Sequence, residues 1–185
     1  LMTEALIRAY MKHEDHMDAY GFEKFLIPEM AQTRVWVPER QSEMPILDRP
    51  LNITERYPWM RLVALRNTEP RSAGTGNFVN CGAAMYMMPV GAVNAGGPQA
   101  AYQEAASLTI AHNESFAVEA ASVIAATYAS AFERDSSIEN ALDTVLEVAH
   151  DGTRNAIGDA VSLVNTDDSL EDFISKTRQT VAPYD

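Results

Sequence analysis

The stretch from Gly74 to Gly97 constrains the fold of this chain more than any other segment. It holds six of the nine glycines, three asparagines and the only cysteine, and alanine-rich segments follow it. Glycine tolerates positive φ and lets the backbone approach a neighbouring group closely. Backbone N–H groups at the start of a following helix favour anions such as phosphate. The stretch therefore predicts a loop between helices that wraps around a bound ligand.

The composition is that of a soluble globular protein, with 46% apolar and 22% charged residues. The 185 residues fit a single domain, which we expect to span residues 1–185. The net charge of −12 argues against nucleic acid as a partner, because phosphates would be repelled, but it allows a small anionic ligand. No apolar run reaches membrane-span length and no signal-peptide pattern is present, so no membrane association is expected. A single cysteine excludes an internal disulfide and fits a reducing cytoplasm, the expected location.

Apolar spacing and capping residues predict an all-α fold. The segment 3–20 begins a helix in which Leu6 and Tyr10 share a face, with Thr3 as its N-cap. Alanine and serine between 117 and 131 let neighbouring helices approach closely. We expect the other helices near 22–32, 58–65, 98–112, 114–131, 153–164 and 169–181, and one that starts at 138 and stops at Gly152.

Three further patterns bear on the fold. Residues 34–52 are predicted to form a long irregular connection, because three prolines interrupt them, and no alternating strand pattern of useful length is present. The methionines and the tyrosine at 85–88 are predicted to be core. A buried apolar stripe is expected on one face of the helix that starts at 138, made of Ile138, Leu142, Val145, Leu146 and Val148.

Short motifs follow one another in order between Cys81 and Ala121. They read G-A-A-M at 82–85 with Pro89 after it, L-T at 108–109 with His112 after it, and V-E-A-A at 118–121. In this order they resemble the motifs of the ADP-ribosylglycohydrolase family, which includes the dinitrogenase-reductase-activating glycohydrolases. The segment that begins E-A-L at Glu4 is similar to the family's first long helix, so the resemblance covers most of the chain.

The resemblance implies an all-α, orthogonal multi-helix fold and a hydrolase that cleaves an ADP-ribose glycosidic bond with two Mg²⁺ or Mn²⁺ ions. The implied partner is ADP-ribose or an ADP-ribosylated substrate. The family's metal ligands come from a T-D-D-T motif near the N-terminus and a D-x-D-x-S/T motif near the C-terminus. These would fall before Leu1 and beyond Asp185. We therefore expect a central fragment, truncated at both ends, that supplies the substrate-binding part, holds no metal ligand and is inactive alone; its catalytic residues stay unassigned.

In the family, a similar glycine- and asparagine-containing loop wraps the diphosphate and distal ribose of ADP-ribose. Successive backbone amides can hold a pyrophosphate without basic side chains. The structural alternative is a tight glycine turn between two helices. Tyr86 stands where the family often has arginine, and Cys81 where it often has asparagine or glycine, so substrate preference can differ. The matching loop residues here are Gly76, Asn77, Phe78, Val79, Asn80, Cys81 and Gly82.

His112 matches a family histidine that lines the ADP-ribose pocket and contacts the ligand rather than acting as a base. The alternative is a histidine at a helix C-terminus, satisfied by carbonyls and favoured by the helix dipole. Cys81 could be a reactive thiol at a helix N-terminus. No histidine lies near it in sequence to act as a base, so we expect a small packing residue and not a nucleophile.

Two other patterns are similar to metal-binding motifs, but we assign them structural roles. His13 and His16 are spaced for a shared ligand, but no third ligand is evident, so we place them on a solvated face of the first helix. Residues 166–169 spell T-D-D-S, close to the family's metal motif, but they follow the glycine loop instead of preceding it. We interpret them as the N-cap of the helix that follows. No metal ligand is predicted in this chain.

A second class of function is compatible with the same residues. Relatives that lost the metal ligands, including lens crystallins similar to the glycohydrolases, are not enzymes. The alternative is therefore a non-catalytic ADP-ribose-binding module or a structural, crystallin-like protein.

Overall fold

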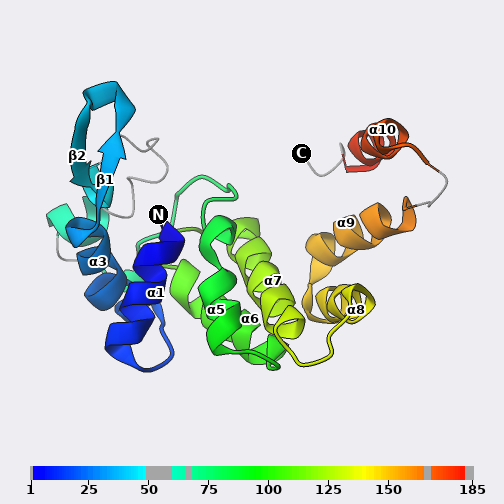
Figure 1. Cartoon of the computed structure of the whole chain (residues 1–185), viewed down its shortest axis with the longest axis horizontal. Helices are drawn as coiled ribbons and strands as arrows, with labels where there is room; N and C mark the ends of the chain where they lie inside the picture. Colours follow the sequence, from blue (N-terminus) through cyan, green and yellow to red (C-terminus); the bar gives the residue numbers. More distant parts are fainter. Residues whose placement is uncertain (1, 49–59, 66–67, 165–167, 182–185) are drawn as a thin grey trace.

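The structure is a computed structural model that describes residues 2–48, 60–65, 68–164 and 168–181. It is built of helices and one small hairpin (Figure 1), which confirms the all-α fold class. The α-helices are Met2–His13 (α1), Ala19–Gly21 (α2), Ile27–Gln32 (α3), Met88–Val93 (α5), Pro98–Thr109 (α6), Phe116–Ala131 (α7), Ile138–Val148 (α8), Asp151–Ser162 (α9) and Leu170–Val181 (α10). Short π-helical segments are Phe22–Leu26 (η1) and Met60–Leu65 (η4), and 3-10 segments are Pro38–Arg40 (η2), Ile46–Asp48 (η3), Pro70–Ser72 (η5) and Ala84–Tyr86 (η6).

Helix starts agree with the capping residues of the sequence in three places. Pro98 opens α6 at a position where its missing N–H costs nothing. The Ser137 side chain accepts a hydrogen bond from the Asn140 amide at the start of α8. At α10, the Ser169 hydroxyl accepts from the Asp172 amide at 3.2 Å. The capping interpretation of this acidic segment is therefore confirmed at Ser169, while residues 166–167 lie outside the described part of the chain.

Three predicted helix boundaries are wrong. Thr3 is not an N-cap, because α1 already includes Met2, and α1 ends at His13 rather than near residue 20. Gly152 does not stop a helix but lies in the first turn of α9, whose N-cap position is His150. The helix before it ends because Ala149 adopts an extended conformation.

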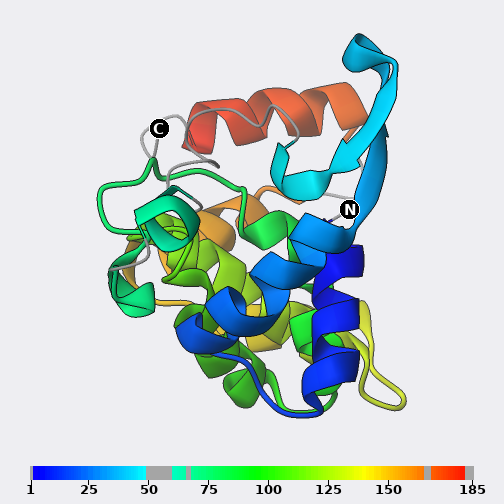
Figure 2. The ribbon, with the colours of Figure 1, turned by 90° about the vertical axis from the view of Figure 1, so that its left-hand side faces the viewer.

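A two-stranded hairpin replaces the predicted irregular connection. Arg34–Val37 (β1) pairs antiparallel with Ser42–Pro45 (β2), and Arg34 lies opposite Pro45. Side chains alternate along β1, so that Val35 and Val37 are buried while Trp36 is 60% exposed. The prediction of no strand was wrong because four-residue strands give too short an alternation to stand out. Figure 2 shows the hairpin extending from the end of α3, which lies beside α1.

The alanine-rich helix α7 lies at the centre of the bundle and contacts α5, α6 and α8. At its crossing with α5, a Cβ on Gly91 would lie 2.3 Å from the Tyr128 Cβ and 2.8 Å from the Ala125 carbonyl oxygen. Only glycine fits that crossing. The prediction that small residues between 117 and 131 permit close helix packing is confirmed.

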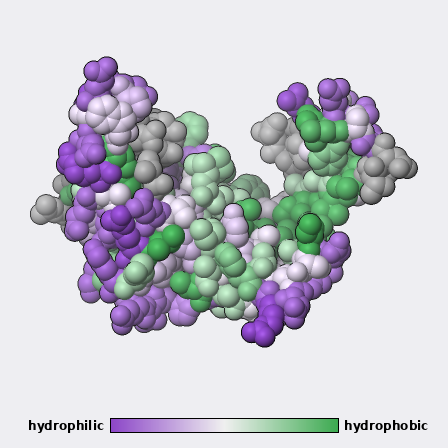
Figure 3. All heavy atoms as spheres, in the orientation of Figure 1, coloured by the Kyte–Doolittle hydropathy of each residue, from purple (hydrophilic) through white to green (hydrophobic). Residues whose placement is uncertain are grey.

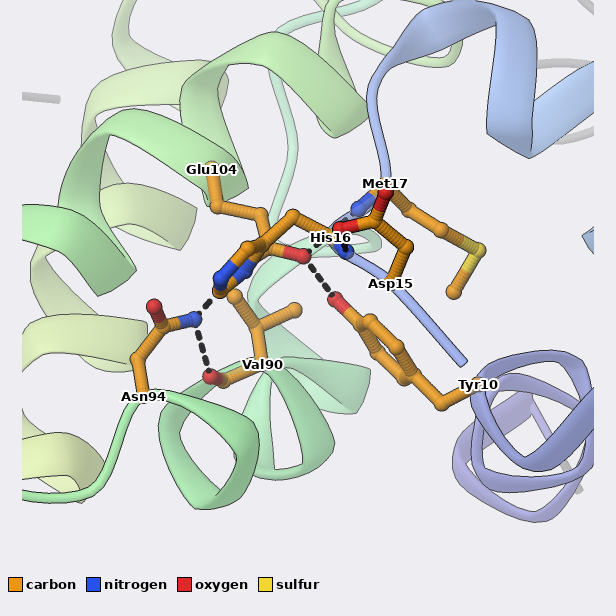
Figure 4. A network of polar contacts seen from close by, with 7 residues as sticks. All are labelled: Tyr10, Asp15, His16, Met17, Val90, Asn94 and Glu104. Carbon is orange, nitrogen blue, oxygen red and sulfur yellow. Dashed lines mark hydrogen bonds and ion pairs between the residues drawn. The ribbon is translucent and has the colours of Figure 1, made fainter. Parts of the chain in front are cut away.

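A buried carboxylate joins α1, α5 and α6 (Figure 4). Oε1 of Glu104 accepts from the Tyr10 hydroxyl at 2.7 Å and the Met17 amide at 2.8 Å. Its Oε2 contacts the Asn94 amide nitrogen at 2.6 Å and His16 Nδ1 at 2.5 Å. The hydrogen bond between His16 and Glu104, together with the negative charge of that carboxylate, raises the pKa of His16. His16 lies after α1, and its contact with Glu104 links that connection to α6. Its side chain is 64% exposed, so the prediction of a solvated histidine is confirmed, whereas its placement within the first helix was wrong.

Helices α8, α9 and α10 form an arm that extends from the central helices, at the right of Figure 1. The predicted stripe of α8 is buried only in part, since Val145 and Val148 are buried but Ile138 is 76% exposed. Figure 3 shows hydrophobic surface gathered over this arm. None of the helices in the described ranges has the length and apolar character needed to cross a membrane.

Candidate functional site

The loop of residues 74–82 rests on the connection between α6 and α7. The Gly74 amide donates to the Ile110 carbonyl at 3.2 Å, and the Asn77 amide closes a turn onto the Gly74 carbonyl at 3.0 Å. A Cβ on Gly74 would lie 2.4 Å from the backbone oxygen of Asn113 and 2.6 Å from that of Ile110. Because both neighbours are backbone, they cannot move aside. The loop can reach this position only with glycine at residue 74.

Two asparagine side chains set the path of the loop. The Asn77 amide group donates to the His112 carbonyl at 2.7 Å and accepts from the Phe78 amide at 2.9 Å. Asn80 Oδ1 accepts from the Gly82 amide at 2.7 Å. The structure therefore brings the predicted loop residues and His112 together. The side chains of Phe78 and Val79 are 71% and 52% exposed, so the outer face of the loop is open to solvent.

The backbone amides of the loop are mostly engaged within the protein. The Gly76 amide, at a residue with φ of +78°, donates to the Glu114 carboxylate at 2.9 Å. Among the residues that the structure describes, the amides of Val79 and Cys81 have no hydrogen-bond partner. The long helix expected after the stretch from Gly74 to Gly97 is α6, which begins at Pro98, but the loop of residues 74–82 is itself followed by the three-residue η6 and the six-residue α5. An anion at this loop would therefore be held by the amides of Val79 and Cys81 and not by a helix dipole.

His112 lies beneath the loop with its ring buried. Tyr86 places its hydroxyl 3.1 Å from His112 Nδ1, and the Phe22 ring stacks on the imidazole with centroids 6.0 Å apart. The imidazole Cε1 would lie 3.7 Å from a Cβ on Gly82. Burial lowers the pKa of His112 to about 4. His112 lies just after the C-terminus of α6, where its backbone amide donates to the Thr109 carbonyl at 2.8 Å, and its imidazole is neutral at pH 7.

The depressed pKa of His112 predicts that the protein loses stability in mild acid. Below pH 6.5, the ordinary pKa, the unfolded chain takes up a proton that the folded chain accepts only near pH 4. The contribution of neutral His112 to the free energy of unfolding is fully present above pH 6.5 and falls by ~3 kcal/mol as the pH approaches 4. Between pH 7 and 4.5, urea unfolding should show wild type losing ~2–3 kcal/mol more than His112→Asn, which lacks this titration. Equal losses in the two proteins would contradict the prediction.

Three features of the site could not be read from sequence spacing. Asn113 is fully buried, and its Oδ1 has no hydrogen-bond partner in the described part of the chain. Arg61 of η4 donates from Nη1 to the carbonyls of Ala73 and Thr75, which brings a cation to the loop. Ser115 has a φ of 56°, a conformation that costs a non-glycine residue ~1–3 kcal/mol and is concentrated at functional sites.

Several predicted roles around the loop are corrected. Cys81 is exposed, so its interpretation as a packing residue was wrong. Met85 is 67% exposed and is not core, whereas Tyr86 and Met87 are buried as predicted. His13 stacks on Phe25 with ring centroids 4.0 Å apart. No group of three or more His, Cys, Asp or Glu side chains able to hold a metal ion occurs in the described ranges.

The helical fold agrees with the fold class that the sequence resemblance implies. The chain belongs to the ADP-ribosylglycohydrolase family, whose sequence model matches residues 1–183. The family consists of hydrolases that act on ADP-ribosylated substrates and are in general metal-dependent. No curated protein and no solved structure matches the chain significantly.

Proposed function

We propose that this chain binds ADP-ribose in the loop of residues 76–82 and against His112, as the substrate-binding part of a hydrolase that cleaves an ADP-ribose glycosidic bond. The observation that carries the proposal is the hydrogen bond from Asn77 to the His112 carbonyl. It joins the glycine-rich loop to the one histidine of the ordered motifs. A tight structural turn would need no such attachment to the backbone of His112.

The chemistry of the loop suits a nucleoside diphosphate. The amides of Val79 and Cys81 can donate to phosphate oxygens, and Arg61 brings a cation to the carbonyls of Ala73 and Thr75 where the loop begins. The exposed Phe78 ring offers a surface on which a base can stack. The Glu114 carboxylate would have to leave the Gly76 amide before an anion could bind there.

The described residues do not fit the metal site that the family implies. Two divalent ions need several carboxylate oxygens in one place, and the described ranges contain no such group. No catalytic acid, base or nucleophile is therefore assigned to this chain. We retain Mg²⁺ or Mn²⁺ as a proposal for the reaction, with no residue here as its ligand.

Calorimetric titration of ADP-ribose onto the protein tests the proposed site. We expect binding, and we expect Asn77→Leu to weaken it by at least ~10-fold, because the loop loses its attachment to His112. Asn155→Leu, an exposed change of the same chemistry on α9, serves as the matched control and should leave the affinity unchanged. Absence of binding by wild type, or equal affinities for the two variants, would reject the site.

The alternative is a non-catalytic ADP-ribose-binding module or a structural, crystallin-like relative. Hydrolysis of an ADP-ribosylated peptide by the intact enzyme to which this chain would belong, measured with and without Mg²⁺, distinguishes the possibilities. Metal-dependent release of ADP-ribose supports the hydrolase. Binding without turnover supports the module, and neither binding nor turnover supports the structural role.

A further inference from the structure

The Glu104 carboxylate holds the connection between α1 and α2 through two contacts of different kinds. Its Oε1 accepts from the buried backbone amide of Met17 at 2.8 Å, and that donor does not ionise. Its Oε2 lies 2.5 Å from Nδ1 of His16, whose imidazole can gain or lose a proton near neutral pH. The Glu104 side chain is 5% exposed, whereas that of His16 is 64% exposed. The connection is therefore attached to a buried anion by an ionisable group that stays in contact with solvent.

His16 also lies at the border between two cavities. The first has a volume of about 300 Å³ and is lined by residues of α1, the connection and Val93 of α5. The second has a volume of about 350 Å³ and lies over α6, beside Asn94 and Glu104. Among the residues that the structure describes, His16 is the one that lines both cavities. Figure 4 shows its ring beside the Glu104 carboxylate, so a movement of the ring away from Glu104 would join the two cavities.

The ionisable groups around these cavities are one imidazole, one phenol and several carboxylates: His16, Tyr10, Glu14, Asp15, Asp18 and Glu104. The α5 side of the cavities contributes Val93 and Asn94, which carry no charge. In general, carboxyl groups titrate near pH 4 and phenols near pH 10. Burial and the negative charge of Glu104 raise the pKa of the Tyr10 phenol further. The charge that changes near neutral pH is therefore that of His16.

We propose that His16 is a pH-dependent latch, which holds the connection between α1 and α2 on Glu104 as an imidazolium and releases it as a neutral imidazole. A neutral ring keeps at most a hydrogen bond to the carboxylate, which is weaker than a charge-assisted ion pair. Because Glu104 raises the pKa of His16, the stabilisation by the latch is fully present below pH 6.5 and is lost as the pH rises through that raised pKa. The contacts that form the latch do not involve the loop of residues 74–82, so the inference is independent of the proposed function.

Hydrogen exchange at the Met17 amide measures the release, because this amide leaves Glu104 when the connection opens. NMR gives its protection factor, which is corrected for the intrinsic pH dependence of amide exchange, between pH 6 and 8.5. In wild type we expect the protection factor of Met17 to fall about fivefold over this range. The midpoint of the fall should coincide with the titration of the His16 Cε1 proton. Amides in the middle of α7 report on global unfolding, and their protection factors should not change with the His16 titration.

Two glutamine variants assign the effect to one histidine. His16→Gln keeps a polar side chain but cannot take up a proton, so its Met17 protection factor should stay near the high-pH value of wild type at every pH. The matched control is His13→Gln, which removes the histidine at the end of α1 that stacks on Phe25 and should retain the wild-type pH dependence. A wild-type protection factor that does not change with pH overturns the latch. A change that persists in His16→Gln also overturns it, because another group would then be responsible.

Discussion

Replacing Gly74 with alanine should destabilise the protein by ~4 kcal/mol and abolish ADP-ribose binding. The new methyl would lie 2.4 Å from the Asn113 carbonyl oxygen, 2.6 Å from that of Ile110 and 2.8 Å from the Asn113 amide nitrogen. All three atoms are backbone, so the loop must separate from the α6–α7 connection. Separation breaks the Gly74–Ile110 hydrogen bond and draws Asn77 away from the His112 carbonyl. Urea unfolding gives the stability and calorimetry gives the binding.

Two other glycine substitutions separate the clash from general effects of the methyl group. At Gly76 a Cβ would meet nothing within 4 Å, but φ is +78°, so Gly76→Ala should cost only ~1 kcal/mol of backbone strain. At Gly158, inside α9, the nearest atom lies 3.9 Å away, so alanine should be neutral or stabilising by up to ~1 kcal/mol. A Gly74→Ala protein as stable as these two would contradict the close approach of the loop.

The sequence could predict those features of the fold that depend on neighbouring residues, such as the starts of helices. Pro98, Ser137 and Ser169 act through the residues next to them in the chain, and each marks a helix start in the structure. The order of motifs likewise identified the loop and His112 before any contact was visible. Capping residues and motif order can both be read along the chain, so neither prediction required knowledge of which helices pack together.

Contacts between distant residues could not be predicted in the same way. Glu104 lies 87 residues or more from the Tyr10 and Met17 groups that it binds, and nothing in its neighbourhood marks it as buried. The hydroxyl that contacts His112 Nδ1 comes from Tyr86, which the sequence marked as a core residue and as a departure from the family's arginine, with no sign of that contact. The hairpin was missed for the opposite reason: the signal was local but only four residues long, and Pro38 and Pro45 suggested a loop. Asn113 became notable only when its Oδ1 proved to be buried without a partner in the described structure.

Replacing Glu104 with leucine should destabilise the protein by ~4 kcal/mol. Leucine is similar in size, so the change leaves no large cavity, but it removes the acceptor of three buried donors. These are the Tyr10 hydroxyl, the Met17 amide and one Asn94 N–H (Figure 4). Each becomes a buried polar group without a partner, which costs ~1–3 kcal/mol. Chemical denaturation at pH 7 measures the loss.

A double-mutant cycle with Tyr10→Phe tests whether unpaired donors cause that loss. In the Glu104→Leu background the Tyr10 hydroxyl is a buried donor without an acceptor, so Tyr10→Phe should restore ~1–2 kcal/mol of the free energy of unfolding. In wild type the same change should be destabilising. The matched control for the loss of a carboxylate is Glu133→Leu, an exposed change after the end of α7 that should stay within ~0.5 kcal/mol of wild type. If Tyr10→Phe were destabilising by the same amount in both backgrounds, the two side chains would not be coupled. Glu104 would then stabilise the junction of α1, α5 and α6 through packing alone, with no contribution from the hydrogen bonds to its carboxylate.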